Sequence, residues 1–314
     1  MTVLITGAAG FVGRHLAPLV AAGGDPVVGW YRPGSVSPEW PGITWRAVEL
    51  RDRTAVAAAL AADRPDAVYH CAGVAHVGDS WAQAEDTLAS NVIGTAHLVD
   101  GLVALGLAPR VVVTGSATVY RASDAPLTED SPLAPNTPYG TSKLAQEMVA
   151  LTAWRERGLP VIVTRSFNHI GPFQSPAFAA ASFARQLAAI EAGLAPPTIS
   201  VGNLAAARDV TDVRDTVRAY AALMARGRPG ERYNVCSGRA VPVQALLDGL
   251  RARVRVPVEV VADPARMRPV DTPVIVGSHD RLTADTGWTP SHDLDATLDA
   301  LLDYWRAEVR TPTA

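Results

Sequence analysis

The alternation of short apolar runs with longer helical segments constrains the fold of this chain more than any other feature. Six apolar runs of three to five residues alternate with segments of helical periodicity between residues 3 and 164. Short apolar strands between helices are typical of βαβ units, in which the strands are parallel and buried on both faces. Right-handed crossovers then predict a doubly wound α/β sheet whose ligands bind at the carboxyl ends of the strands. The expected strands are residues 3–5, 26–30, 44–47, 67–70, 110–114 and 160–164.

The helical segments and the prolines suggest a division of the chain into two parts. In the first part, helices are expected at residues 11–22, 53–62, 81–105 and 138–157. The later segments are less regular, with helices expected at 178–192, 212–225, 243–254 and 293–306 and short strands at 232–235 and 258–261. We therefore expect a regular α/β domain over residues 1–165 and a smaller mixed α/β part over 166–314 that interleaves with it.

Composition narrows the classes of function. The chain carries 28 Lys and Arg against 31 Asp and Glu, and no basic stripe interleaved with aromatics, which argues against nucleic acid as a partner. Its two cysteines have no paired spacing and its seven histidines fall in no metal-ligand spacing, so we expect neither a disulfide scaffold nor a metal site. There is no apolar run of membrane-spanning length and no basic leader, which favours a cytoplasmic enzyme without membrane contact.

A glycine-rich turn joins the first expected strand to the first expected helix. Gly7, Gly10 and Gly13 have the spacing G-x-x-G-x-x-G. In a dinucleotide site the first glycine permits a tight turn, the second lets the backbone approach a pyrophosphate, and the third allows close packing of helix on sheet. The amides at the helix N-terminus, beginning with Phe11 and Val12, then hold the phosphates. A turn without a ligand is the alternative, but the position directly after the first strand favours a Rossmann-type NAD(P)-binding domain.

The end of the second expected strand bears on which dinucleotide binds. A carboxylate at this point usually holds the adenosine ribose hydroxyls, but residues 29–32 are Gly-Trp-Tyr-Arg. Arg32 can instead pair with a 2′-phosphate, which favours NADP, although an exposed arginine at a strand end has the same pattern and NAD stays possible. Further cofactor contacts are expected after strands three and four: Glu49 and Leu50 beside the adenine, and Ala72 and Gly73 along the ribose and phosphates.

A tyrosine and a lysine four residues apart begin the helix expected at 138–157. Thr137 can cap this helix, so Tyr139 and Lys143 both lie within it. Because they are four residues apart, they lie on the same face of the helix. A free phenol has a pKa of about 10, and a nearby ammonium group lowers it, which would make the tyrosine a competent proton donor. Ser116 follows the fifth strand and can hydrogen-bond a substrate oxygen at the same edge of the sheet. A tyrosine and a lysine at this spacing are more often two surface residues of a helix. The presence of Ser116 at the same edge of the sheet strengthens the prediction that the pair is catalytic.

Together these motifs resemble the extended short-chain dehydrogenases/reductases, the NAD-dependent epimerase/dehydratase family. Residues 91–95 and 131–140 match the same group, and the resemblance covers nearly the whole chain. It implies that Tyr139 donates a proton, that Lys143 assists it and bonds the nicotinamide ribose, and that Ser116 orients a ketone. It also implies a homodimer that associates through the helices following positions 81 and 138.

Three segments of the expected substrate-binding part narrow the resemblance. Residues 165–172, 201–215 and 233–238 are similar to the family members that reduce GDP-4-keto-6-deoxy-D-mannose to GDP-D-rhamnose. The resemblance implies contacts to the sugar, diphosphate or base of a nucleotide sugar from Asn168, Arg208, Arg268 and Asp271. Structural alternatives remain for these residues, such as a turn cap for the asparagine or a surface ion pair of Arg208 with Asp209 or Asp212.

The sequence departs from the family at positions near the expected site. Two residues past Ser116, related dehydratases carry a catalytic Glu and related epimerases a Cys, whereas this chain carries Thr118. A threonine cannot remove a carbon-bound proton at neutral pH, so dehydration and 3,5-epimerisation are disfavoured. Phe173 stands where a glycine is expected in Gly-Pro-Gly-Gln.

We therefore predict an oxidoreductase that reduces the C4 ketone of a nucleotide-linked 4-keto-6-deoxy sugar with NADPH. Two alternatives stay open. One is a nucleotide-sugar 4-epimerase that recycles tightly bound NAD, which the missing carboxylate after the second strand disfavours. The other is a non-catalytic NADP-sensing protein, which would have no need of a lysine-activated phenol.

Overall fold

Seven parallel strands form the central sheet of the structure, a computed structural model that describes residues 1–36, 40–75, 78–267 and 274–311. The strands are β1 (Val3–Thr6), β2 (Val27–Tyr31), β3 (Ile43–Ala47), β4 (Ala67–His70), β5 (Arg110–Ser116), β6 (Val161–Ser166) and β10 (Arg232–Val235). Their order in the sheet is β10-β6-β5-β4-β1-β2-β3. The doubly wound parallel sheet predicted from the sequence is confirmed. The chain winds outward in opposite directions from β1 and β4, so a ligand crevice is expected between their carboxyl ends.

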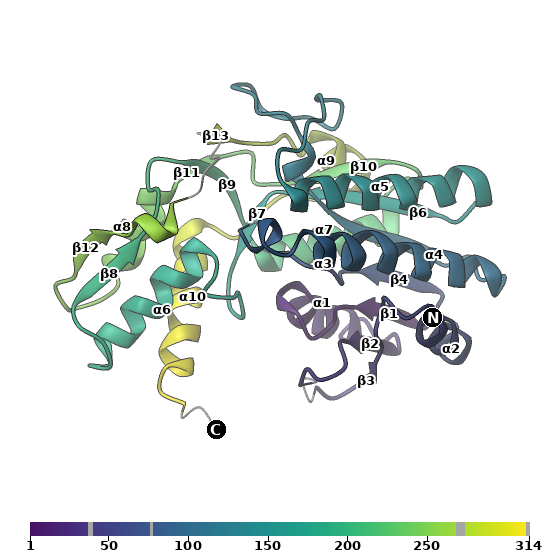
Figure 1. The fold of residues 1–314 in the computed structure, drawn as a ribbon, viewed down its shortest axis with the longest axis horizontal. Coiled ribbons are helices and arrows are strands. Elements are labelled where there is room, and N and C mark those ends of the chain that lie inside the picture. Colours follow the sequence, from purple (N-terminus) through teal and green to yellow (C-terminus); the bar gives the residue numbers. More distant parts are fainter. Residues whose placement is uncertain (37–39, 76–77, 268–273, 312–314) are drawn as a thin grey trace.

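Helices cover both faces of this sheet (Figure 1). On one face lie α1 (Phe11–Ala21) and α7 (Val213–Arg226), and on the other lie α2 (Arg53–Asp63), α4 (Gly94–Ala104) and α5 (Pro138–Arg157). Because side chains alternate along a strand, Val3 and Ile5 enter the core beneath α1 and α7, whereas Leu4 enters the core beneath the other three helices. Packing on both faces holds the strand ends in place at the edge of the sheet where ligands bind.

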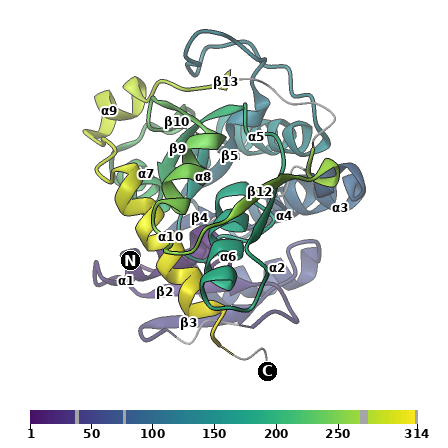
Figure 2. The ribbon, with the colours of Figure 1, turned by 90° about the vertical axis from the view of Figure 1, so that its left-hand side faces the viewer.

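A third core lies in the C-terminal part, at the left of Figure 1 and toward the viewer in Figure 2. It is built from α6 (Ala179–Glu191), α8 (Val243–Arg251), α10 (Leu294–Glu308) and a parallel pair of strands, β8 (Thr198–Val201) and β12 (Glu259–Ala262). A small mixed sheet joins β9 (Ala207–Asp212) to β7 (Asn168–Ile170), β11 (Ala240–Pro242) and β13 (Val274–Ile275). The remaining α-helices of the described residues are α3 (Ala84–Leu88) and α9 (Asp280–Thr286). The chain beyond residue 165 therefore builds this unit and also supplies α7 and β10 to the large sheet.

The helix predicted over residues 81–105 is present without a break over residues 84–104, but its first half is irregular. A 3-10 turn, η1 (Asp79–Trp81), and α3 are followed by a π-helical segment, η2 (Ala89–Ile93), before α4 begins. Asn91 in this segment turns its side chain inward, where it accepts from the Val74 amide at 2.8 Å and donates to Ser142 Oγ at 2.9 Å. π-helical segments recur at functional sites, and this one places a buried amide between the cofactor edge of the sheet and α5.

Several other elements depend on contacts that the sequence pattern does not show. The helix expected at 243–254 ends at Arg251, and β7, β11 and β13 are two or three residues long, too short to display an alternating pattern. Their pairing with β9 defines them as strands. Within the described ranges, no helix combines the length and the apolarity that a membrane span requires.

Candidate active site

The turn between β1 and α1 is packed so tightly that it requires glycine. Gly7 has a φ of +68°, and a Cβ there would lie 2.7 Å from the backbone of Ala72. A Cβ on Gly13 would lie 2.4 Å from the carbonyl oxygen of Gly7. The helix therefore begins directly against the turn. Gly10 is its N-cap and supplies no side-chain hydrogen bond to the first-turn amides, which include those of Phe11 and Val12.

A cavity of about 390 Å³ opens at the carboxyl ends of β1, β2, β3 and β4. The residues predicted from the sequence that line it are Gly7, Gly10, Arg32, Glu49, Leu50, Ala72 and Gly73. The glycine cradle and the first-turn amides of α1 fit the diphosphate of a dinucleotide, because they allow close backbone approach and supply donors. The structure thus brings the predicted cofactor residues of four separate strand ends to one cavity.

Charged side chains at the mouth of this cavity differ in their contacts. Among the described residues, the exposed side chain of Arg32 has no hydrogen-bond or ion-pair partner. Glu49, in contrast, accepts hydrogen bonds from the amide of Arg51 at 3.1 Å and from its Nε at 3.4 Å. Arg51 and Arg14 also line the cavity, and the sequence analysis missed both. Each of them is next in the chain to a residue that was predicted to bind the cofactor, Leu50 or Gly13, and this adjacency could have identified them.

Local sequence signals place the tyrosine and the lysine at the start of α5. Thr137 caps the helix by accepting from the Gly140 amide at 3.0 Å, and Pro138 occupies the first turn. A Cβ on Gly140 would lie 2.7 Å from the carbonyl oxygen of Thr118, so α5 packs directly on the turn that follows β5. This contact brings Tyr139 beside Ser116, and both side chains are 8% exposed.

Lys143 is held by hydrogen bonds beneath the cavity. Its Nζ donates to the Thr114 carbonyl oxygen at 3.0 Å and to Gln146 Oε1 at 2.9 Å. A Cβ on Gly73 would lie 3.7 Å from this Nζ, so the lysine directly underlies the cofactor loop after β4. Burial lowers the pKa of Lys143 to about 8. Asn91 and Gln146 complete the polar layer around Lys143, and sequence reasoning assigned neither of them a place in the site.

The expectation that Lys143 lowers the pKa of Tyr139 does not hold in this geometry. The lysine Nζ lies 6.0 Å from the centroid of the tyrosine ring and donates to other partners. Burial raises the pKa of Tyr139, and a hydrogen bond with Ser116 opposes that rise. Desolvation of the phenolate therefore outweighs its neighbours. A raised pKa makes the phenol a weaker acid than a free tyrosine, and Ser116 offsets part of that effect.

The two described substrate-side residues, Asn168 and Arg208, lie on the small mixed sheet. Asn168 begins β7 and is paired in register with Val210 of β9, two residues beyond Arg208. The neighbouring Asp209 is buried and accepts from the amides of Ser237 and Gly238, so it fastens two of the three segments that carry the narrower resemblance. Arg268 and Asp271 lie outside the described residues.

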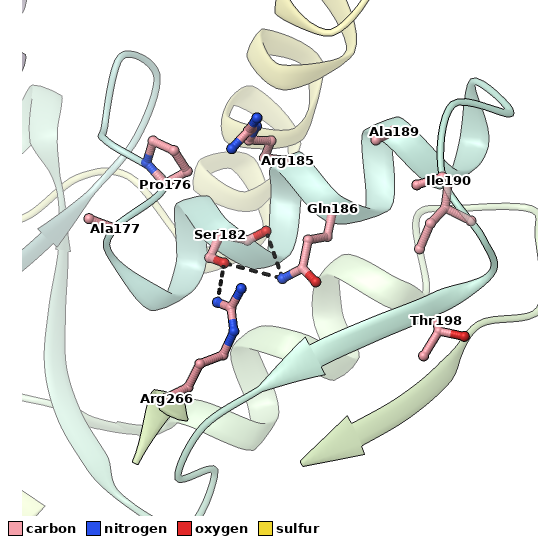
Figure 3. A pocket seen from close by; sticks show the side chains of 10 residues that line it. Pro176, Ala177, Ser182, Arg185, Gln186, Ala189, Ile190, Thr198 and Arg266 are labelled. Atoms are coloured by element: carbon pink, nitrogen blue, oxygen red, sulfur yellow. Dashed lines mark hydrogen bonds between the residues drawn. The ribbon is translucent and has the colours of Figure 1, made fainter. Parts of the chain in front are cut away.

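A second cavity, of about 380 Å³, lies in the C-terminal part between α6, the start of β8 and a 3-10 turn, η4 (Pro264–Arg266). In Figure 3, Ser182, Gln186 and Arg266 converge at its wall, and Ser182 Oγ accepts from Arg266 Nη1 at 3.0 Å and from Gln186 Nε2 at 3.2 Å. Arg185 lies on the same helix beside this cluster. Sequence reasoning missed these residues, although polar side chains at positions 182, 185 and 186 interrupt the apolar stretch of this helix.

Phe173 occupies a backbone conformation that favours glycine. Its φ is +69°, which explains why a glycine was expected there. The ring packs at 4.9 Å from that of Tyr304 and at 5.5 Å from that of His15, and the Arg14 guanidinium lies 5.3 Å from its centroid. These contacts join the cofactor helix α1 to α10 of the C-terminal part and offset the backbone strain.

Comparisons with known proteins agree with this geometry. The model of the NAD dependent epimerase/dehydratase family matches residues 3–236. GDP-6-deoxy-D-mannose reductase of Pseudomonas aeruginosa is 35% identical over 317 residues, which cover 98% of each protein.

Two solved structures are similar over almost their whole length. The structure of RMD from Pseudomonas aeruginosa complexed with NADPH has a TM-score of 0.86 at 34% identity, covering 98% of this chain and 99% of that one. The UDP-glucose 4-epimerase of Thermotoga maritima with UDP-glucose has a TM-score of 0.90 at 25% identity, covering 99% and 100%.

Proposed function

Since the chain belongs to the NAD-dependent epimerase/dehydratase family and is an NAD(P)-dependent oxidoreductase, we propose that it uses NADPH to reduce GDP-4-keto-6-deoxy-D-mannose to GDP-D-rhamnose. The observation that carries this proposal is the placement of Tyr139 beside Ser116, with Lys143 beneath the Gly73 loop of the cofactor cavity and Thr118 in place of a carboxylate or thiol. The reductase of Pseudomonas aeruginosa, with 35% identity over 98% of both chains, supports the same substrate.

The three side chains divide the work of ketone reduction. When bound, the reduced nicotinamide supplies a hydride to the carbonyl carbon. Tyr139 gives its phenolic proton to the carbonyl oxygen, and Ser116 donates a hydrogen bond to that oxygen as negative charge develops on it. We propose that Lys143, which donates to the Thr114 carbonyl oxygen, also bonds the nicotinamide ribose. Burial raises the pKa of Tyr139 and Ser116 opposes that rise, so Ser116 makes the phenol a better proton donor than burial alone would.

The mouth of the cofactor cavity supports NADPH over NADH. Arg32 is exposed there, and Ser35 lies on the same wall, where a guanidinium and a hydroxyl suit a 2′-phosphate. No carboxylate stands at the end of β2 to hold two ribose hydroxyls. Glu49, the nearest acid in the cavity wall, is already held by Arg51.

The nucleotide sugar is assigned to the C-terminal part. We propose that Asn168 and Arg208 contact the sugar and diphosphate, with Arg268 and Asp271 completing the site. The second cavity has room for the base, and Ser182, Gln186 and Arg266 supply hydrogen-bonding groups in its wall. Planar guanidinium groups are suited to diphosphate oxygens.

An exposed apolar face supports association into a homodimer. Trp81, Leu88, Ile93 and Met148 are 58%, 40%, 47% and 61% exposed, on the neighbouring elements η1, α3, η2 and α5. Patches of this kind mark interaction surfaces. Light scattering should give twice the chain mass of 33.0 kDa, and the double variant Ile93→Glu/Met148→Glu should give the monomer mass. A monomeric parent protein would contradict the proposal.

We expect the dimer to work in the cytoplasm, where its free thiols stay reduced.

The function is tested by following the absorbance of the reduced nicotinamide after GDP-4-keto-6-deoxy-D-mannose is mixed with the protein and either NADPH or NADH. We expect fast oxidation of NADPH and slow oxidation of NADH, with the configuration of the product assigned by NMR. Arg32→Ala should raise the KM for NADPH by about tenfold, the effect of losing one charge-assisted hydrogen bond, and should leave the KM for NADH unchanged. Oxidation of neither cofactor would reject this substrate. NAD released from the purified protein on denaturation would instead favour a 4-epimerase.

A further inference from the structure

Thr118 stands at the position where related dehydratases carry their catalytic base, and the steps derived above give it no task. In the structure, both its backbone amide and its hydroxyl group contact Ser116. The amide of Thr118 donates to Ser116 Oγ at 3.2 Å, and its hydroxyl donates to the same oxygen at 3.0 Å. Ser116 is thereby the N-cap of the 3-10 turn η3 (Ala117–Val119).

These two contacts determine what else the serine hydroxyl can do. A hydroxyl group has one proton to donate and two lone pairs that accept. Both lone pairs of Ser116 Oγ are occupied by donors from Thr118. The serine proton is therefore the group left for a third partner. Tyr139 is the nearest candidate, because its helix packs through Gly140 on the Thr118 carbonyl oxygen. Ser116 also opposes the rise in the pKa of Tyr139 that burial causes. A hydrogen bond lowers the pKa of an acid when it is donated to the charged form.

We propose that Thr118 is a positioning residue that restricts Ser116 to donating its hydrogen bond, first to the carbonyl oxygen of the substrate and, once the proton has been transferred, to the phenolate oxygen of Tyr139. The inference rests on the proposed function only in taking a ketone oxygen as the second acceptor. As hydride forms the new C–H bond, the carbonyl π pair moves to oxygen, which takes the proton of Tyr139 as NADPH becomes NADP⁺. Ser116 keeps its proton throughout and stabilises the phenolate that remains.

The turn that carries Thr118 is held firmly enough for this role. The Ala134 amide donates to the Val119 carbonyl oxygen at 3.1 Å, and the Tyr120 amide donates to the Ala117 carbonyl oxygen at 3.1 Å. On the other side, Gly140 of α5 abuts the Thr118 carbonyl oxygen. The helix that carries Tyr139 therefore packs against the same turn that orients Ser116. This packing helps to set their relative placement.

Thr118→Val and Thr118→Ser are matched tests, because valine keeps the shape of the side chain and serine keeps its hydroxyl. In Thr118→Val one lone pair of Ser116 becomes free to accept from the Tyr139 phenol, which favours the neutral phenol. We expect kcat for ketone reduction to fall by about tenfold, the loss of one neutral hydrogen bond, with the KM for NADPH unchanged. Thr118→Ser should recover most of the rate.

A second measurement needs no sugar substrate. The near-ultraviolet absorbance of tyrosinate is titrated in the NADP⁺-loaded protein, and the signal of the matching Tyr139→Phe variant is subtracted to isolate Tyr139. The titration of Thr118→Val should move to higher pH than that of the parent, and that of Thr118→Ser should not. Circular dichroism confirms that each protein stays folded over the range used.

The outcomes separate this inference from the proposed function. An unchanged tyrosinate titration in Thr118→Val would overturn the role of Thr118, whatever the substrate. Equal impairment in Thr118→Ser would show that the methyl group and its packing matter and would also overturn it. A parent protein that fails to reduce the GDP-linked ketone, while the Thr118→Val titration still shifts, would reject the proposed substrate alone.

Discussion

Replacing Tyr139 with phenylalanine should lower kcat for ketone reduction by about 10²- to 10⁴-fold, the contribution of a positioned general acid. Ser116 can still donate a hydrogen bond to the substrate oxygen, but its hydroxyl is a far weaker acid than a phenol. The ring itself is 8% exposed and packed at the start of α5, so the variant keeps its shape and its cofactor cavity. Steady-state NADPH oxidation measures kcat, and quenching of NADPH fluorescence measures cofactor affinity, which should not change.

A matched control removes a phenol hydroxyl elsewhere. Tyr304 lies on α10 against Trp305, in the C-terminal core, so Tyr304→Phe should leave kcat unchanged. A Tyr139→Phe enzyme that kept most of its rate would mean that another group supplies the proton. The reduction mechanism given above would then be wrong at its central step.

Replacing Glu147 with alanine should lower the free energy of unfolding by about 3–5 kcal/mol, the usual cost of leaving one partner of a buried ion pair uncompensated. Glu147 on α5 is 3% exposed and Arg165 on β6 is 2% exposed. They share two hydrogen bonds, of 2.7 and 2.9 Å, and Arg232 of β10 donates to the same carboxylate at 2.7 Å. The variant would bury the Arg165 charge without its counterion. Urea unfolding followed by circular dichroism measures the loss.

Glu156→Ala is the matched control, because this glutamate lies exposed near the end of the same helix. Its effect should stay within about 0.5 kcal/mol, as for most surface substitutions. If both variants unfold at the same urea concentration, the buried ion pair does not hold α5 on the sheet.

The stabilisation from Glu147 should also depend on pH. Burial alone would raise the pKa of this carboxyl, but hydrogen bonds from Arg165 and Arg232 outweigh it and hold the pKa below its ordinary value. A folded-state pKa below the unfolded one gives stabilisation that is complete above the unfolded pKa, about 4.3 for Glu, and is lost as pH falls toward the folded value. The stability difference between parent and Glu147→Ala should therefore shrink in acid. A constant difference would contradict this origin.

Local signals account for the parts of the fold that were predicted best. The helix α5 has the predicted bounds, 138–157, because Thr137 caps it, Pro138 starts it and Gly158 ends it in a left-handed conformation. The π-helical segment around Asn91 and the strand β7 were not predicted. Both depend on contacts with segments far away in the chain, which no local pattern contains.

The candidate site divides in the same way. The predicted residues of the cofactor cavity come together because parallel strands all end at one edge of the sheet. The residue types just after each strand were therefore enough to predict which residues line this cavity. Arg51 and Gln146 escaped prediction because their importance lies in the direction their side chains take. The pKa of Tyr139 was expected to fall and instead rises, because burial depends on everything packed around the ring.

Periodicity, glycine spacing and helix caps were therefore enough to specify the doubly wound sheet and its cofactor edge, and motif spacing with the family resemblance singled out the three side chains expected to act there. These features are carried by residues close together in the chain, and each has its own local physical cause. The second cavity, the buried Glu147–Arg165 pair and the orientation of Ser116 by Thr118 against Tyr139 arose from packing instead. Desolvation and the direction of a hydrogen bond depend on which neighbours the folded chain supplies, and distant segments supply most of them.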